Sequence, residues 1–183
     1  MNHIYYHSKD LDGLTSGAIL KEKFPNAQLS GYHYGEPFDT RYYNQNIVMA
    51  DVTLEPEMLF ELAKNCQSFT LIDHHVSAYD KIMKFAEQNN IEKLHGEVNG
   101  LIDMIEFPEY NFTYYYSAVL SACEMCITLY PFGNFSLRTK VKYLGQYDTW
   151  RKGAKALATD FPWETVMAFQ YGARRFTTPQ QVL

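Results

Sequence analysis

Cysteine is scarce in this sequence, with only three residues in a chain of 183. So few cysteines cannot form the disulfide framework that stabilises small secreted domains. Cys123 and Cys126 form a C-x-x-C pair, but they lie in the periodic segment SAVLSACEMCITLY, and no second pair completes a zinc site. We therefore expect the cysteines to be small core residues of a protein in a reducing cytoplasm.

Long apolar runs and an excess of basic residues are also missing. No stretch of about 18 apolar residues could span a membrane, and the N-terminus MNHIYYHSKD does not resemble a secretory signal. The formal net charge is −5, whereas long nucleic acids usually meet a basic face. A small phosphate ester or a short oligonucleotide is therefore favoured over a long polymer. The sequence predicts a cytoplasmic protein without a membrane partner, and it is compatible with a homodimer.

The apolar fraction of 46% supplies a sizeable core, and the first half of the chain alternates strand and helix patterns. Strand patterns cover residues 3–8, 28–35, 46–51 and 68–75, and helical patterns follow at 14–24, 55–65 and 79–90. This alternation predicts an α/β fold, a mostly parallel sheet with helices on both faces. Residues 91–112 are expected to form a loop with short elements. Further helices are expected at 115–129, at 136–143 with Ser136 as the N-cap, and at 162–176.

Acidic residues and histidines gather where the expected strands end. They are His7, Asp10, Asp12, Asp51, Asp73, His74 and His75. The C-terminal ends of parallel strands share one edge of the sheet, where ligands bind. Four carboxylates in one cleft would repel one another unless cations offset their charge. One ion would be overfilled by these ligands, so the sequence predicts two divalent ions that share a carboxylate. The mixed ligands favour Mn²⁺, with Mg²⁺, Co²⁺, Fe²⁺ and Zn²⁺ as alternatives.

Paired metal ions of this kind commonly serve the cleavage of phosphate esters. Gly13 is expected to allow a tight turn into a helix that begins near Thr15. The hydroxyl groups of Thr15 and Ser16 would then contact an anionic substrate at the helix N-terminus. His33 is expected to be a half-buried or surface histidine without a functional role.

Four motifs in sequence order resemble those of the DHH phosphoesterase superfamily, over roughly Ile4 to Arg151. They are HSKDLDGLTSGAI, VMADVT, IDHH and LGQYDTWR. The segment YYSAVLSACEM is similar to the Ser-Ala helix between the third and fourth motifs of the family. The spacing between His7 and Asp10 differs among family branches, so the RecJ-like and nanoRNase-like branches both remain open.

The resemblance implies a role for each motif residue. One Mn²⁺ would be held by His7 and Asp10, the other by Asp12, His74 and Asp148, with Asp51 bridging both; His75 would contact the phosphate and protonate the leaving oxygen, Asp73 would orient the histidines, and Arg151 would contact the substrate. Asp148 enters this set through the resemblance, because on its own it fits a helix-capping aspartate equally well.

Many family members carry a second domain with a Gly-rich, His-containing motif, and no such stretch precedes Leu183. We expect residues 1–150 to form a DHH catalytic domain and residues 151–183 a helical segment leading toward a substrate-binding domain that is absent from this chain. The expected function is Mn²⁺-dependent hydrolysis of phosphodiester bonds in short oligonucleotides or dinucleotides. Hydrolysis of pyrophosphate or polyphosphate, RecJ-type exonuclease action, and a metal- or nucleotide-binding module that is inactive without a second domain remain alternatives.

Overall fold

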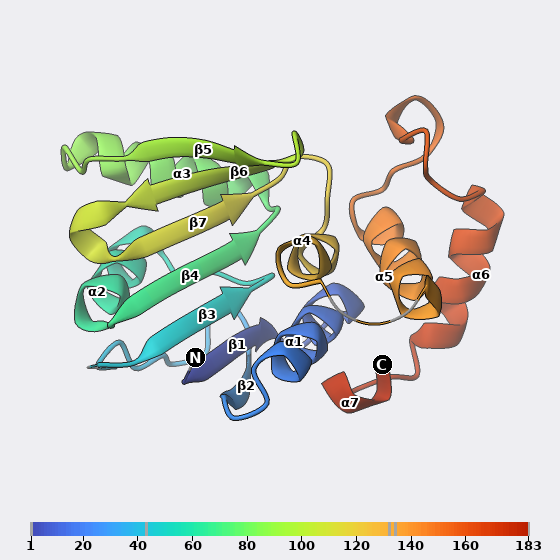
Figure 1. Ribbon diagram of the computed structural model, residues 1–183, viewed down its shortest axis with the longest axis horizontal. Helices are drawn as coiled ribbons and strands as arrows, with labels where there is room; N and C mark the ends of the chain where they lie inside the picture. Colours follow the sequence, from blue (N-terminus) through green and yellow to red (C-terminus); the bar gives the residue numbers. More distant parts are fainter. Residues whose placement is uncertain (1, 43, 132, 134, 183) are drawn as a thin grey trace.

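A seven-stranded sheet organises the computed structural model, which describes residues 2–42, 44–131, 133 and 135–182 (Figure 1). The strands are β1 His3–His7, β2 Gln28–Tyr32, β3 Asn46–Ala50, β4 Ser68–Asp73, β5 Leu94–Val98, β6 Ile102–Phe107 and β7 Phe112–Tyr116. Their order is β2-β1-β3-β4-β7-β6-β5. The first five strands in this order pair in parallel, whereas β6 is antiparallel to both β7 and β5. The expected mostly parallel α/β sheet is confirmed.

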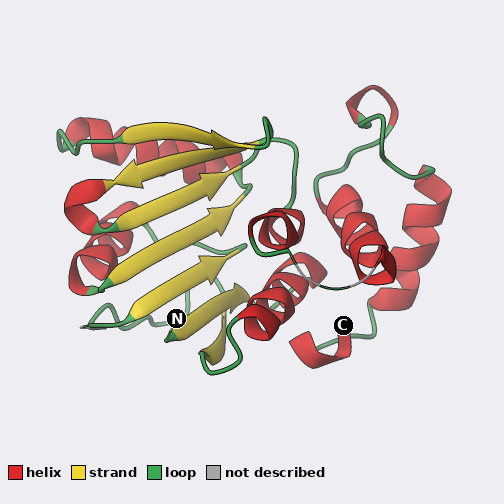
Figure 2. Cartoon of the chain, viewed as in Figure 1, coloured by secondary structure: helices red, strands yellow, loops and turns green. Residues whose placement is uncertain are grey.

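Helices cover both faces of the sheet (Figure 2). They are α1 Leu11–Lys23, α2 Pro56–Asn65, α3 Val76–Gln88, α4 Ala122–Leu129, α5 Phe135–Asp148, α6 Trp163–Ala173 and α7 Pro179–Val182, with 3-10 turns at Pro108–Tyr110 and Gly153–Lys155. Helices α2 and α3 pack on one face, and α1 and α4 pack on the other. In the part of the chain described here, no helix combines the length and hydropathy needed to cross a bilayer.

The central strands are apolar on both faces because both faces are covered. In β4, Leu71 packs toward α2 and α3, while the next residue, Ile72, packs toward α1 and α4. Alternate side chains therefore enter two separate cores. The three cysteines are free and buried, as expected for small core residues. Cys123 and Cys126 lie in α4, where they pack in the second of these cores.

The expectation of a loop with short elements at residues 91–112 is confirmed only in part, because most of this segment forms the β5–β6 hairpin. Strand β5 lies at the edge of the sheet, and its side chains are mostly exposed, so it carries little apolar pattern. Strand β6, IDMIEF, places Ile105 and Phe107 in the core beside α2 and α3, and Ile102 in the core on the other face. The spacing of two between Ile105 and Phe107 was the available signal for a strand.

The helix expected at residues 115–129 is wrong over its first part. Tyr114 and Tyr116 lie in β7, between β4 and β6, and both are buried. Aromatic side chains fit a pleated, buried surface better than they fit a helix start. Helix α4 begins only at Ala122, where Ser121 is the N-cap and forms a capping box with Glu124.

The later helices also differ in their bounds from the expectation. Helix α5 runs from Phe135 to Asp148, so Ser136 lies within the helix and is not its cap. The extension to Asp148 places that carboxylate at the C-terminal end of α5. Beyond it, α6 packs against α5, and α7 packs against α1. Residues 163–173 are helical, somewhat fewer than the expected 162–176.

Candidate metal centre

Three neighbouring parallel strands deliver acidic and histidine side chains to one edge of the sheet. His7 ends β1, Asp51 follows β3, and Asp73 ends β4. The register aligns these ends: Ala50 pairs with Ile72, and the Asp51 N–H donates to the Ile72 carbonyl at 2.9 Å. The ligand atoms of three groups each lie within 4.8 Å of one another: His7, Asp10 and Asp51; Asp12, His74 and Asp148; and Asp51, His74 and His75. The structure thus brings together the side chains that the motifs predicted as ligands.

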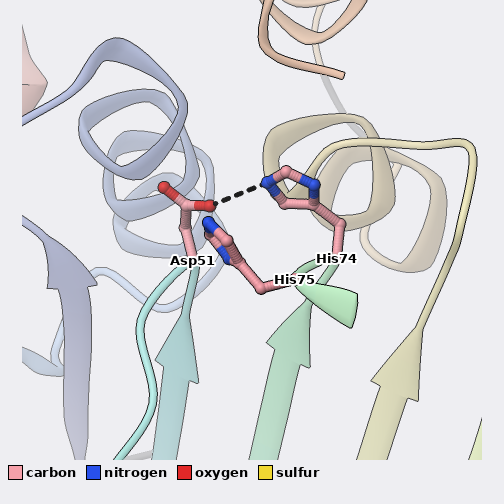
Figure 3. A group of neighbouring side chains, drawn as sticks. All are labelled: Asp51, His74 and His75. Carbon is pink, nitrogen blue, oxygen red and sulfur yellow. Dashed lines mark ion pairs between the residues drawn. The ribbon is translucent and has the colours of Figure 1, made fainter. Parts of the chain in front are cut away.

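Asp51 lies between the two sides of this cluster. Its Oδ1 is 3.4 Å from His74 Nε2 (Figure 3). Its Oδ2 is 3.8 Å from His7 Nδ1. The side chain is 1% exposed, and neither oxygen has a hydrogen-bond partner among the described residues. The backbone adopts φ of 62°, which is uncommon for a residue other than glycine and typical of functional sites. Burial, followed by repulsion from Asp12 and Asp10, raises the pKa of Asp51 well above its usual value.

On one side of Asp51, His7 and Asp10 form an ion pair. Asp10 is also the N-cap of α1, because its Oδ1 accepts from the Gly13 N–H at 2.8 Å. Helix α1 therefore begins at Leu11, before the expected start near Thr15. The role expected for Gly13 in a tight turn is also wrong. A Cβ at Gly13 would lie 2.2 Å from the His7 carbonyl oxygen, so glycine is required for the helix to pack against β1.

A residue that sequence reasoning left without a function, His33, contacts this side of the cluster. Its Nδ1 is 3.1 Å from His7 Nε2, and the two rings are stacked with centroids 5.4 Å apart. A hydrogen bond to the far nitrogen of a ligand histidine holds its ring orientation and tautomer. His33 follows β2, the strand beside β1. The contact between His33 and His7 follows from the pairing of β2 with β1. The motifs do not contain this pairing, so only a prediction of the strand order could have identified His33.

On the other side of Asp51, His74 lies between two carboxylates. Its Nε2 is 3.0 Å from Asp148 Oδ2 and 3.7 Å from Asp12 Oδ2. Burial alone would lower the pKa of His74, but the neighbouring carboxylates of Asp148 and Asp12 outweigh burial and raise this pKa to about 9. Without another cation in the cluster, His74 is therefore protonated at neutral pH.

Asp12 is held by the N-terminus of α4. Its carboxylate accepts from Ser121 Oγ at 3.0 Å, from the Ala122 N–H at 2.9 Å and from the Cys123 N–H at 2.8 Å. Unsatisfied N–H groups at a helix start favour a carboxylate in this place. Burial and the nearby charge of Asp148 nevertheless raise the pKa of Asp12. The α4 donors fix the direction in which this carboxylate faces His74.

His75 and Asp73 form a separate pair at the start of α3. The fully buried Asp73 accepts from His75 Nδ1 at 2.6 Å, and this hydrogen bond raises the pKa of His75. The His75 side chain is 41% exposed, whereas His74 is 12% exposed. Asp73 was expected to orient both histidines, but among the described residues its hydrogen bonds go to His75 only. His75 is therefore the histidine available to solvent and to a bound molecule.

Thr15 and Ser16 do not line this cleft as expected. Both are buried in α1, at 1% and 0% exposure. Thr15 Oγ1 donates to the Leu11 carbonyl within its own helix at 2.6 Å. Because α1 begins four residues earlier than expected, these hydroxyls lie in its second turn and not at its N-terminus. The expectation that they contact a substrate is corrected accordingly.

Arg151 also differs from its expected role as a substrate contact. The residue is 3% exposed, and every guanidinium nitrogen already donates to an acceptor. It forms a two-nitrogen ion pair with Glu124 of α4, at 2.6 and 2.8 Å, and a third bond to Asp160 at 3.1 Å. A Cβ at Gly145 would lie 2.4 Å from the Glu124 carboxylate, so α5 must approach α4 closely here. Arg151 thus joins α4, which holds Asp12, to the end of α5, which carries Asp148.

Comparison with known proteins supports the fold and does not extend to function. No protein-family model and no curated protein match this chain. A solved structure described as an uncharacterized protein from Helicobacter pylori G27 superposes with a TM-score of 0.60 at 16% identity. The superposition covers 96% of this chain and 49% of that one, so this chain spans about half the length of the similar protein. At this level of identity, the similarity establishes a shared α/β architecture.

Loss of the Arg151 guanidinium should strongly destabilise the fold. Arg151→Met leaves the buried Glu124 without its cation and leaves Asp160 with Lys142 alone, at 4.0 Å. Breaking a buried ion pair commonly costs about 3–5 kcal/mol. Urea unfolding followed by circular dichroism measures this change. Lys155→Met, a nearby lysine with an exposed side chain, is the control and should change stability by about 0.5 kcal/mol or less. An Arg151→Met loss no larger than that of the control would contradict the structural role.

Removal of the Asp51 charge should stabilise the metal-free chain at neutral pH. The pKa of Asp51 is raised in the folded state, so its contribution to stability is present below about pH 4 and is lost as pH rises through the folded pKa. Asp51→Asn should therefore raise the free energy of unfolding at pH 7.5 by about 1–3 kcal/mol, the usual cost of a buried unpartnered group. The difference in unfolding free energy between Asp51→Asn and the parent should become smaller as the pH falls toward 4. Asp103→Asn, at an exposed site on β6, is the control.

Proposed function

We propose that this chain is a metal-dependent phosphoesterase of the DHH type that hydrolyses short phosphodiester substrates with two Mn²⁺ ions. The observation that carries the proposal is the state of Asp51. A 1% exposed carboxylate among other acids, whose two oxygens accept no hydrogen bond from the described residues, is costly unless cations bind there. One of its oxygens faces His7 and the other faces His74. This arrangement fits a carboxylate that bridges two ions.

The donor set also fits the proposed ions. One ion would be held by His7 and Asp10, the other by Asp12, His74 and Asp148, and both by Asp51. Carboxylate oxygens mixed with imidazole nitrogens suit Mn²⁺, with Mg²⁺ or Co²⁺ as alternatives. When bound, the ions would polarise a phosphoryl group and a water molecule. The supporting contacts are already in place, because α4 holds Asp12 and His33 holds His7.

His75 is the proposed general acid. Its Nδ1–H donates to the buried Asp73, which fixes the ring and leaves Nε2 to give a proton to the leaving oxygen. The hydrogen bond raises the pKa of His75, and so increases the protonated fraction near neutral pH. The higher exposure of His75 relative to His74 suits a residue that meets substrate rather than one enclosed by ligands.

Binding of Mn²⁺ tests the bridged site directly. Calorimetry on the metal-stripped chain should give two ions, and Asp51→Asn should weaken both, whereas Asp103→Asn should weaken neither. The affinity should also rise by about tenfold per pH unit between pH 6.5 and 8.5. The reason is that the protonated His74, with its pKa raised to about 9, must lose its proton before it can bind an ion. Binding of a single ion, or binding of two ions with affinities that Asp51→Asn leaves unchanged, would contradict the proposal.

Replacement of His75 separates the roles of the two neighbouring histidines. His75→Ala should leave Mn²⁺ stoichiometry at two and lower kcat for a 5′-phosphorylated diadenylate by about 10² or more, as expected for loss of a general acid. His95→Ala, at an exposed histidine on β5, is the matched control. If His75→Ala removed an ion, His75 would be a ligand, as the Asp51, His74 and His75 group also allows.

A further inference from the structure

A cavity of about 380 Å³ opens beside the proposed metal centre. One wall is the segment from Ser8 to Leu11, which includes Asp10. The opposite wall comes from the C-terminal part of the chain, with Gln170, Arg174 and Thr177 as its polar residues. A group bound here would therefore lie next to the His7 and Asp10 side of the cluster. The motifs did not predict that residues after 151 reach this cleft.

The rim of this cavity carries two cations. Lys9 and Arg174 are exposed, and within the described residues neither forms an ion pair with an acid. Arg174 donates to the Tyr147 hydroxyl at 3.0 Å, and its guanidinium lies 5.0 Å from the centre of the Tyr171 ring. The lining includes a single acid, Asp10, which is already paired with His7. Two cations without acidic partners suit a phosphate group.

Gln170 is the buried polar residue of this wall. It is 8% exposed and lines the cavity. Its side-chain nitrogen can donate to a phosphoryl or sugar oxygen of a molecule in the cavity. Its Oε1 is enclosed by protein and has no hydrogen-bond partner among the described residues. The nitrogen of Gln170 therefore adds a neutral donor to the two cations of the rim.

The remaining lining distinguishes between kinds of phosphate compound. Leu11, Leu14 and Phe176 form an apolar part of the wall. Inorganic pyrophosphate has no apolar surface to place there, whereas the sugar and base of a nucleotide do. Ligand sites of this kind combine apolar walls with a few placed polar groups. The composition of the cavity therefore matches a nucleoside phosphate better than a chain of phosphates alone.

We infer that the cavity between the β1–α1 segment and the end of α6 binds a nucleoside phosphate unit of the substrate, next to the phosphate that is cleaved. Lys9 and Arg174 hold the phosphate, Gln170 bonds to it or to a sugar hydroxyl, and the apolar wall contacts the nucleoside. This inference rests on the proposed function and places a nucleoside phosphate unit of its substrate in this cavity. It also makes the C-terminal helices part of the binding site.

Calorimetry with adenosine 5′-monophosphate tests the inference on the full chain with Mn²⁺ present. Lys9→Met and Arg174→Gln should each weaken binding by about tenfold or more, as expected for loss of a charged hydrogen bond. Lys84→Met, at an exposed lysine of α3, is the matched control and should bind as the parent does. Adenosine without its phosphate should bind far more weakly. Unchanged affinity in both Lys9→Met and Arg174→Gln would overturn the inference.

Pyrophosphate as a second probe separates the two sources of phosphate. Pyrophosphate that binds at least as tightly as the nucleotide, and loses affinity equally in Lys9→Met and Arg174→Gln, would overturn the nucleoside assignment. Because binding is measured without cleavage, a chain that hydrolyses no ester can still confirm this site. Conversely, hydrolysis of bis(p-nitrophenyl) phosphate by a parent chain that does not bind the nucleotide would overturn the inference and leave the proposed function standing.

Discussion

Repulsion between carboxylates at the end of three parallel strands is the constraint on which this structure depends. Asp12 and Asp51 are buried within one cleft, with Asp10 and Asp148 beside them. The chain offsets part of the cost with its own groups: the N-terminus of α4 donates to Asp12, and a protonated His74 faces the acids. Asp51 forms no hydrogen bond among the described residues, and His74 Nε2 faces its Oδ1 at 3.4 Å. Burial of Asp51 without a hydrogen bond therefore remains a cost to the fold.

Much of this centre could be predicted because strand ends and short motifs are local features of sequence. His7, Asp51 and His74 each follow an apolar strand pattern, and the parallel topology brings such ends together. The β5–β6 hairpin was missed because an exposed edge strand has little apolar periodicity. The start of α1 was misplaced because Asp10 was treated only as a ligand, although it also caps the helix. A sequence pattern that assigned Asp10 to the metal site did not reveal its second role as the helix cap.

The residues whose roles changed most are those that depend on contacts between distant segments. Arg151 follows a motif aspartate, but its function is set by Glu124, 27 positions earlier, and by Asp160. His33 gains its contact with His7 only because β2 pairs with β1. Gln170 reaches the cleft because α6 packs on α5, beside α1. No local pattern contains these pairings, so the sequence alone could not assign them.

The hydrogen bonds from the start of α4 to Asp12 link two segments that are synthesised at different times. The acceptor and the Ala122 N–H are 110 positions apart in the chain. During synthesis, the carboxylate on α1 is complete long before its helical donors leave the ribosome. Until these donors have been synthesised, Asp12 lacks the hydrogen bonds that it accepts from Ser121, Ala122 and Cys123 in the complete fold. The Asp12 carboxylate can therefore be fully hydrogen-bonded only after Cys123 has been synthesised.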